Sequence, residues 1–198
     1  NGTAVGHLAK TARTIGAKLI HYSTDYVFNG ENESGYKEND ITDPLNAYGR
    51  SKLLGEQAVK NICEEYYIIR TSWLFGKKGK NFVDTMINIG KEKREVEVVD
   101  DQFGKPTYAV DLAERTRELI ENKMTFGIYH ITNEGQTSWF DFAKKIYEVS
   151  EMKVSVTPVS SEQFSRPAKR ANYSSLINTK MPSSREWQVA LKEYIKKQ

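Results

Sequence analysis

Apolar positions along this chain fall into two alternating patterns. Short apolar runs occur at residues 17–22, 66–70 and 127–131, and such runs predict strands buried on both faces of a parallel sheet. Two further strands are predicted at residues 95–99 and 154–157. Apolar residues at helical spacing predict helices over residues 1–12, from 43, over 81–93, over 108–122, from 138 and from about 183. The expected inward-facing positions of the helix over 108–122 are Leu112, Thr116, Leu119 and Ile120, and the last helix carries Trp187, Val189, Leu191 and Ile195. This alternation predicts an α/β fold with a doubly wound parallel sheet and a smaller C-terminal lobe.

The helix predicted to begin near residue 43 has the most informative spacing. Asp43 is of a type that caps helix N-termini, and Pro44 suits the first helical position. Apolar residues recur every fourth position along one side, and this predicted buried stripe comprises Leu54, Ala58 and Ile62. Gly49 and Gly55 also stand inside the helix. Because each glycine costs on the order of 1 kcal/mol against alanine, we expect a ligand or a neighbouring segment to approach closely there.

Tyr48 and Lys52 are four residues apart and therefore project from the same face of this helix. A phenol ordinarily titrates near ~10. A cation one turn away favours the phenolate, so the spacing predicts that Lys52 lowers the pKa of Tyr48 toward a range useful for proton transfer. The alternative interpretation is an ordinary exposed tyrosine–lysine pair.

Three polar residues, Ser23, Thr24 and Asp25, directly follow the first predicted strand. Ligands of open α/β sheets bind outside the carboxyl ends of the strands, where these side chains would lie. Turn chemistry is the alternative for the two hydroxyls. Together with the Tyr48–Lys52 spacing, they favour a site for proton transfer.

Six segments, in this order, resemble the extended short-chain dehydrogenase/reductase family, and within it the reductases of dTDP-linked 4-keto-6-deoxy sugars. The segments are HYSTDYVF (21–28), PLNAYGRSK (44–52), RTSW (70–73), NF (81–82), DQFGKPT (101–107) and RPAKR (166–170). The resemblance covers nearly the whole chain.

The resemblance implies a domain arrangement. Residues 1–125 would form the C-terminal half of an NADP-binding Rossmann domain, with a substrate-lobe insertion near 74–94, and residues 126–198 would be mainly a small α/β substrate-binding lobe. Gly2 and Gly6 follow no predicted strand, so they do not make the family's glycine-rich loop. We therefore expect that about 70–80 further residues precede this segment in the family fold.

The resemblance also implies a reaction, the reduction of a dTDP-linked 4-keto-6-deoxyhexose by NADPH, with NADH as the alternative cofactor. Tyr48 would protonate the ketone oxygen, Thr24 would hydrogen-bond it, and Lys52 would hold the nicotinamide ribose. Ser23 would join Tyr48 and Lys52 at the cofactor. Substrate contacts are implied for Thr24, Asp25, Tyr26, Trp73, Asn81, Gln102, Arg166, Lys169 and Arg170. From the residues alone, the default interpretation of Trp73 is a core residue, and the usual interpretation of the Arg166–Arg170 cations is a solvated loop face.

The sequence leaves two questions open: the role of one long polar stretch and the need for a metal. The glycine- and asparagine-rich stretch between Thr24 and Thr42 is long enough to be a lid on the substrate side. His7, His21 and His130 show no metal-ligand spacing, so no metal site is predicted, and the resemblance leaves a metal requirement open.

Composition narrows the class of partner. The 198 residues carry a formal net charge of +3, which is too slight to indicate nucleic acid but suits a phosphorylated small molecule. Cys63 is the single cysteine, so no internal disulfide is expected. Neither a membrane-spanning run nor a signal peptide is recognised, which favours the cytoplasm. The resemblance is compatible with a homodimer.

Three alternative functions remain at this stage. A nucleotide-sugar dehydratase of this fold would need a glutamate where Tyr26 stands, which disfavours dehydration. An epimerase or another nucleotide-sugar reductase is not separated by the sequence. A non-enzymatic regulatory subunit of the same fold is the alternative from another class, and the basic cluster at 166–170 favours the enzyme over it.

Overall fold

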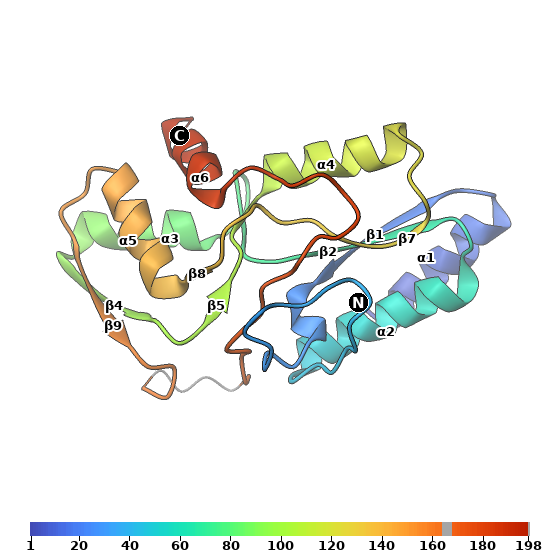
Figure 1. The fold of residues 1–198 in the computed structure, drawn as a ribbon, viewed down its shortest axis with the longest axis horizontal. Coiled ribbons are helices and arrows are strands. Elements are labelled where there is room, and N and C mark those ends of the chain that lie inside the picture. The colour runs from blue at the N-terminus through green and yellow to red at the C-terminus, as the bar shows by residue number, and fades with distance from the viewer. Residues whose placement is uncertain (164–167, 198) are drawn as a thin grey trace.

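The computed structural model describes residues 1–163 and 168–197, which form an elongated molecule of two lobes (Figure 1). One lobe, here the sheet lobe, contains α1 (Thr3–Thr14), β1 (Leu19–Thr24), α2 (Ala47–Ile62), β2 (Tyr66–Thr71), α4 (Ala109–Glu121) and β7 (Gly127–His130). The other, here the small lobe, contains α3 (Phe82–Glu92), β4 (Glu95–Val99), α5 (Trp139–Val149), β9 (Ser155–Val159) and α6 (Trp187–Lys196). Short strands lie between the lobes: β3 (Leu74–Phe75), β5 (Phe103–Gly104), β6 (Thr107–Tyr108) and β8 (Thr137–Ser138).

The sheet lobe is built on the parallel strands β1, β2 and β7, in that order. Ile68 packs with residues of α1 and α2, whereas its neighbour Ile69 packs with residues of α4. Both isoleucines are fully buried because helices cover both faces of the sheet, as the uninterrupted apolar run predicted. The register places Ser23, Arg70 and His130 side by side across the three strands.

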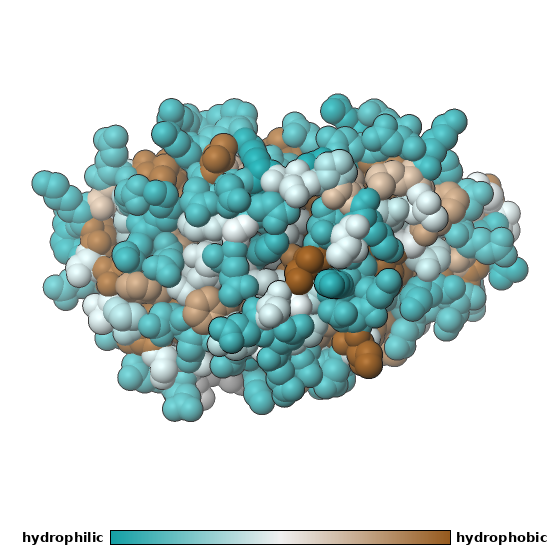
Figure 2. All heavy atoms as spheres, viewed as in Figure 1, coloured by the Kyte–Doolittle hydropathy of each residue, from teal (hydrophilic) through white to brown (hydrophobic). Residues whose placement is uncertain are grey.

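The small lobe is held together by aromatic packing. Strand β4 pairs in parallel with β9, and α3, α5 and α6 enclose a core that includes Phe75, Phe142, Trp187 and Tyr194. The face of the molecule in Figure 2 is mostly polar, with scattered apolar residues. Among the described residues, no helix combines the length and apolar character needed to cross a membrane.

The predicted α/β class is confirmed, and most elements occur where the pattern placed them, but helix α2 differs from its prediction. Its N-cap is Asn46, whose side chain accepts a hydrogen bond from the Gly49 backbone N–H at 2.9 Å, rather than Asp43. Pro44 therefore precedes the helix. The predicted stripe was also wrong at Leu54, which is 59% exposed. The buried positions of α2 lie on an adjacent arc: Gly49, Gly55, Glu56 and Val59.

Two other expectations change. Ile120 was predicted to face inward but is exposed, and α6 begins at Trp187 rather than near residue 183. The stretch between Thr24 and Thr42, considered as a lid, begins with a 3-10 turn (η1, Asp25–Val27) and has its own small core. Phe28 stacks on Tyr36 there, and both are buried against Leu176. This packing attaches part of the stretch to the sheet lobe, and its role as a lid stays a prediction.

The lobes do not divide at one point in the sequence. Strand β7 lies beyond the boundary expected near residue 125, yet it pairs with β2 in the sheet lobe. Strand β4 lies before that boundary, yet it belongs to the small lobe. The division into 1–125 and 126–198 therefore stays a prediction about domains.

Candidate active site

The start of α2 is pressed against the turn that follows β1. A Cβ atom added at Gly49 would lie 2.1 Å from the Tyr26 carbonyl oxygen, so only glycine fits at this crossing. The Asn46 side chain, besides capping the helix, donates to the Lys169 carbonyl oxygen at 3.0 Å. The close approach expected at Gly49 is thus made by protein backbone. It sets the height of the first turn of α2, which carries Tyr48.

Tyr48 is half exposed, and its ring meets that of Tyr26 edge to face at a centroid distance of 5.7 Å. Burial raises the pKa of the Tyr48 phenol, its hydrogen bond with Thr24 lowers it, and the charge of Asp25 raises it again. The predicted lowering by Lys52 is not found, because desolvation prevails. The Lys52 ammonium instead donates to the Tyr22 carbonyl oxygen at 2.5 Å.

Thr24 and Asp25 are more deeply buried than Tyr48. The Thr24 hydroxyl accepts from the Tyr26 backbone N–H and donates to Asp25 Oδ1 at 2.9 Å. Asp25 is only 2% exposed, and burial raises the pKa of its carboxyl to about 6 against hydrogen bonds from Ser174 and Thr24. The enclosed Asp25 carboxylate therefore orients the Thr24 hydroxyl from the interior of the protein. The sugar contact predicted for Asp25 stays a prediction, whereas its hydrogen bond supports a role in orienting Thr24.

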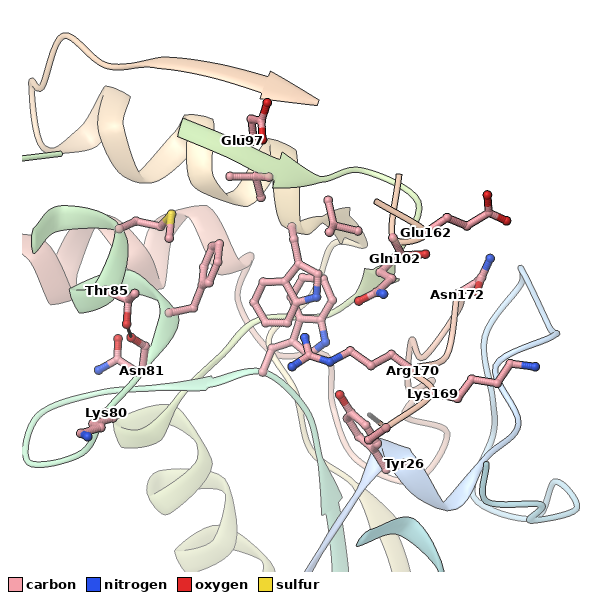
Figure 3. A pocket seen from close by; sticks show the side chains of 18 residues that line it. Tyr26, Lys80, Asn81, Thr85, Glu97, Gln102, Glu162, Lys169, Arg170 and Asn172 are labelled. Carbon is pink, nitrogen blue, oxygen red and sulfur yellow. Dashed lines mark hydrogen bonds between the residues drawn. The ribbon is translucent and has the colours of Figure 1, made fainter. Parts of the chain in front are cut away.

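A pocket of about 900 Å³ opens beside Tyr26 (Figure 3). Six residues that the sequence predicted as substrate contacts line it: Tyr26, Trp73, Asn81, Gln102, Lys169 and Arg170. In Figure 3 the side chain of Arg170 extends into the pocket, whereas that of Lys169 points away from it. Arg166, also predicted to bind substrate, lies outside the described residues.

Trp73 fits both of its sequence interpretations, because it packs against the core of the small lobe and also lines the pocket. Its ring stacks on Trp139 with a centroid separation of 3.5 Å and an interplanar angle of 9°, and both rings line the pocket. Asn81, in contrast, caps α3 by accepting from the Asp84 backbone N–H and donates to the Gly76 carbonyl oxygen. Its polar atoms are engaged in holding the pocket wall.

Sequence reasoning missed three residues of this region: Trp139, Glu56 and Arg70. Glu56 and Arg70 form a buried ion pair at 2.7 Å, and the hydroxyl of Ser23, predicted to touch the cofactor, donates to Glu56 at 2.5 Å. Glu56 stands four residues after Lys52, so helical spacing was an available signal for it. Nothing along the sequence joins Trp139 to Trp73.

The described part of the chain contains no group of three or more His, Cys, Asp or Glu side chains that could hold a metal ion. The ribose of a nicotinamide cofactor has a suitable partner set in Tyr48 and Lys52, a half-exposed hydroxyl and an ammonium on one face of α2. Hydroxyl and ammonium groups are the donors that ribose oxygens accept from, so the residues present fit that part of the group.

A parallel sheet that ends in Ser-Thr beside a helix carrying Tyr-x-x-x-Lys defines the short-chain dehydrogenase/reductase class of proteins. Within it, residues 1–198 match the family described as RmlD substrate binding domain, and the chain belongs to that family.

Individual relatives agree with this assignment. The chain is 40% identical to the spore coat polysaccharide biosynthesis protein SpsK of Bacillus subtilis, over 98% of this chain and 70% of that protein. It is 42% identical to a dTDP-4-dehydrorhamnose reductase of Burkholderia thailandensis, over 90% of this chain and 65% of the relative. A crystal structure of dTDP-4-dehydrorhamnose reductase from Bacillus anthracis in complex with NADP is 43% identical. It superposes with a TM-score of 0.97 over 100% of this chain and 72% of that one. The chain thus spans about two thirds of the length of these relatives.

Proposed function

We propose that this chain is the larger part of an NADPH-dependent reductase that converts dTDP-4-dehydrorhamnose to dTDP-L-rhamnose. The observation that carries the proposal is the position of Tyr48. This half-exposed phenol is hydrogen-bonded to Thr24 and lies edge to face against Tyr26, which is itself part of the wall of the large pocket. We therefore expect the ketone of a sugar bound beside Tyr26 to come within reach of the Tyr48 hydroxyl. Close relatives named for the same reaction support the substrate class.

In the proposed mechanism, reduced nicotinamide supplies hydride to the ketone carbon when the cofactor is bound. Tyr48 gives its hydroxyl proton to the ketone oxygen, which completes the alcohol and leaves a phenolate. Thr24, hydrogen-bonded to Tyr48, would turn its hydroxyl proton from Asp25 Oδ1 to the same oxygen and donate to it as negative charge develops there. The nearby Lys52 ammonium stabilises the phenolate that forms, since opposite charges attract strongly in a partly buried site.

The nucleotide end of the substrate would occupy the pocket itself. The stacked pair Trp73 and Trp139 offers an apolar face to the base or the sugar, and Arg170 offers a planar donor for diphosphate oxygens. We assign Arg166 to the same diphosphate on the resemblance alone. As proposed, the reaction is cytoplasmic, NADH is the alternative reductant, and a homodimer is compatible with the site.

The alternatives are less well supported. Tyr26 occupies the position where a dehydratase would need a carboxylate. A non-enzymatic subunit would not need an aromatic and cationic pocket beside Tyr48. An epimerase would have to turn the bound sugar over, and no feature of the described pocket favours that motion.

The decisive experiment uses the intact protein with NADPH and the dTDP-linked 4-keto sugar, and follows loss of NADPH absorbance. We expect turnover, and we expect Tyr48→Phe to lower kcat by about 10² to 10⁴, the usual contribution of general acid catalysis, with cofactor affinity nearly unchanged. Tyr66→Phe, at the start of β2, is the matched control and should keep full turnover. A Tyr48→Phe variant that retains more than about half of wild-type turnover would remove Tyr48 as the proton donor. No NADPH consumption by the wild type would favour the regulatory subunit.

A further inference from the structure

One face of α2 carries three residues at successive four-residue steps: Tyr48, Lys52 and Glu56. The first two were recognised from the sequence, and the third was not. Glu56 is 1% exposed, which is exceptional for a glutamate, since this residue is rarely buried unless it is paired.

The carboxylate of Glu56 is fully engaged with the sheet below it. Arg70 donates through Nε at 2.9 Å and through a terminal nitrogen at 2.7 Å, and the Ser23 hydroxyl donates at 2.5 Å. Such a two-point guanidinium–carboxylate pair fixes orientation as well as distance. Glu56 is therefore joined to β2 through Arg70 and to the carboxyl end of β1 through Ser23, next to Thr24.

Arg70 extends the connection to the third strand. Its remaining nitrogen approaches the His130 Nε2 at 3.4 Å and the Glu38 carbonyl oxygen at 3.3 Å. Burial and the Arg70 charge lower the pKa of His130, so this ring is neutral and can accept from the guanidinium. The rotation and height of α2 over all three strands are thus set by contacts that pass through Glu56 and Arg70.

Glu56 also acts on Lys52 through its charge. The charged and titratable groups around this face are Glu56 on α2, His21 of β1, Arg70 of β2 and Asp25 of η1. Burial lowers the pKa of the Lys52 ammonium, and the Glu56 carboxylate opposes that effect. Burial lowers the pKa of His21 to about 4, so this ring adds no charge near neutral pH.

We propose that Glu56 is a positioning residue for the reduction proposed above, which holds the Tyr48–Lys52 face of α2 against the ends of β1 and β2 and places a carboxylate one helical turn from the Lys52 ammonium. The inference rests on the proposed function for its catalytic part. Its electrostatic part, the support of the Lys52 ammonium, can be measured without any substrate.

The test uses the double variant Glu56→Gln with Arg70→Met in the intact protein. Glu56→Gln alone would leave the Arg70 charge buried and unpaired, which can prevent folding, whereas removing both charges together is commonly tolerated. The amide at position 56 can still accept from Ser23, so the variant removes charge more than shape. The matched control is Asp111→Asn with Arg185→Met, which removes another ion pair, at 2.6 Å, away from α2.

Two readouts are compared. Competitive acetylation of lysines across a pH series, quantified by mass spectrometry, reports the pKa of the Lys52 amine directly. We expect that pKa to fall in the double variant and to stay at its wild-type value in the control. The alkaline limb of the kcat profile should move to lower pH by the same amount, and kcat near neutral pH should fall about 10-fold or more, with KM for the keto sugar nearly unchanged.

Each outcome decides between the explanations. An unchanged pKa of Lys52 in a folded double variant overturns the inference, whatever the activity. A shifted pKa with an unchanged kcat profile also overturns it, because the contact would then have no catalytic effect. If the wild-type protein does not reduce the keto sugar, the proposed function fails, and the acetylation arm still decides whether Glu56 supports the Lys52 ammonium.

Discussion

Burial, more than charge spacing, sets the ionisation of the groups around Tyr48. The Tyr-x-x-x-Lys spacing predicted a lowered pKa for the Tyr48 phenol, yet desolvation raises it, and Lys52 lies against the Tyr22 carbonyl oxygen instead. Spacing along a helix can be read from a sequence, but the solvent exclusion created by residues distant in the chain cannot. Asp25 shows the same effect more strongly, since burial raises the pKa of its carboxyl to about 6.

Asp25 therefore predicts a pH-dependent change in stability. Its carboxyl binds a proton more tightly when folded than when unfolded, so its contribution to the free energy of unfolding is largest below its unfolded value and is lost as pH rises through about 6. Asp25→Asn keeps the acceptor for Thr24 but removes this titration. Relative to wild type, the variant should gain about 2 kcal/mol of stability on going from about pH 4.5 to about pH 7.5.

Urea unfolding at the two pH values measures this change. Glu114→Gln, an exposed carboxyl on α4, is the control and should show little pH-dependent difference from wild type. A difference between Asp25→Asn and wild type that is the same at both pH values would mean that Asp25 is not titrating in this range.

At the scale of single residues, the sequence predicted those site residues that lie close together along the chain. Thr24 and Tyr48 follow from a strand end and a helix start, and Trp73 from the end of the next strand. Trp139, which completes the aromatic wall, and Arg70, which neutralises Glu56, are brought in by tertiary packing. Their partners are distant in sequence, so no local pattern identifies them.

At the scale of the elements, the spacing of apolar residues predicted where the helices lie better than it predicted which of their faces are buried. Strands β1, β2, β4 and β7 and helices α3, α4 and α5 lie within a few residues of their predicted ranges. The inward positions were wrong at Leu54 and Ile120, which are both exposed. A spacing of three to four residues defines a stripe, but its exact rotation depends on which neighbours cover it.

Helix α2 provides a test at this scale, through its glycines. Gly49→Ala would place a methyl group 2.1 Å from the Tyr26 carbonyl oxygen, so the helix start and the turn must separate. We expect a loss of about 1–3 kcal/mol in the free energy of unfolding, despite the better helix propensity of alanine. In the intact enzyme, kcat should fall as well, because Tyr48 moves with this turn.

Gly6→Ala in α1 is the matched control. Its added methyl would lie 3.7 Å from the Ala58 Cβ, an ordinary contact, so this variant should be neutral or more stable by up to about 1 kcal/mol. Thermal or urea unfolding of both variants measures the contrast. Equal stabilities would show that the turn at Tyr26 yields without cost.

At the scale of the whole molecule, Arg185 joins the two lobes. Its guanidinium donates to Asp111 of α4 at 2.6 and 2.8 Å and to Glu193 of α6 at 2.5 Å. The carboxylate of Asp111 is mostly buried and also accepts from Asn133 at 2.5 Å. The arginine therefore holds an element of the sheet lobe and an element of the small lobe at once.

Arg185→Met should accordingly destabilise the protein by about 1–3 kcal/mol, chiefly because Asp111 loses its charged partner. Arg117→Met removes an exposed pair with Glu121 on the same helix and should change stability by less than about 0.5 kcal/mol. Urea unfolding of both variants measures the difference. Similar small effects in both would show that the lobes are held by apolar packing alone.

The course of the chain between the lobes limits what recombination of the coding sequence can exchange. After β2 the chain enters the small lobe for α3 and β4, returns for α4 and β7, leaves again for α5 and β9, and ends in α6. Neither lobe corresponds to one uninterrupted stretch of coding sequence. Recombination between two related genes could therefore not exchange either lobe as a single continuous piece.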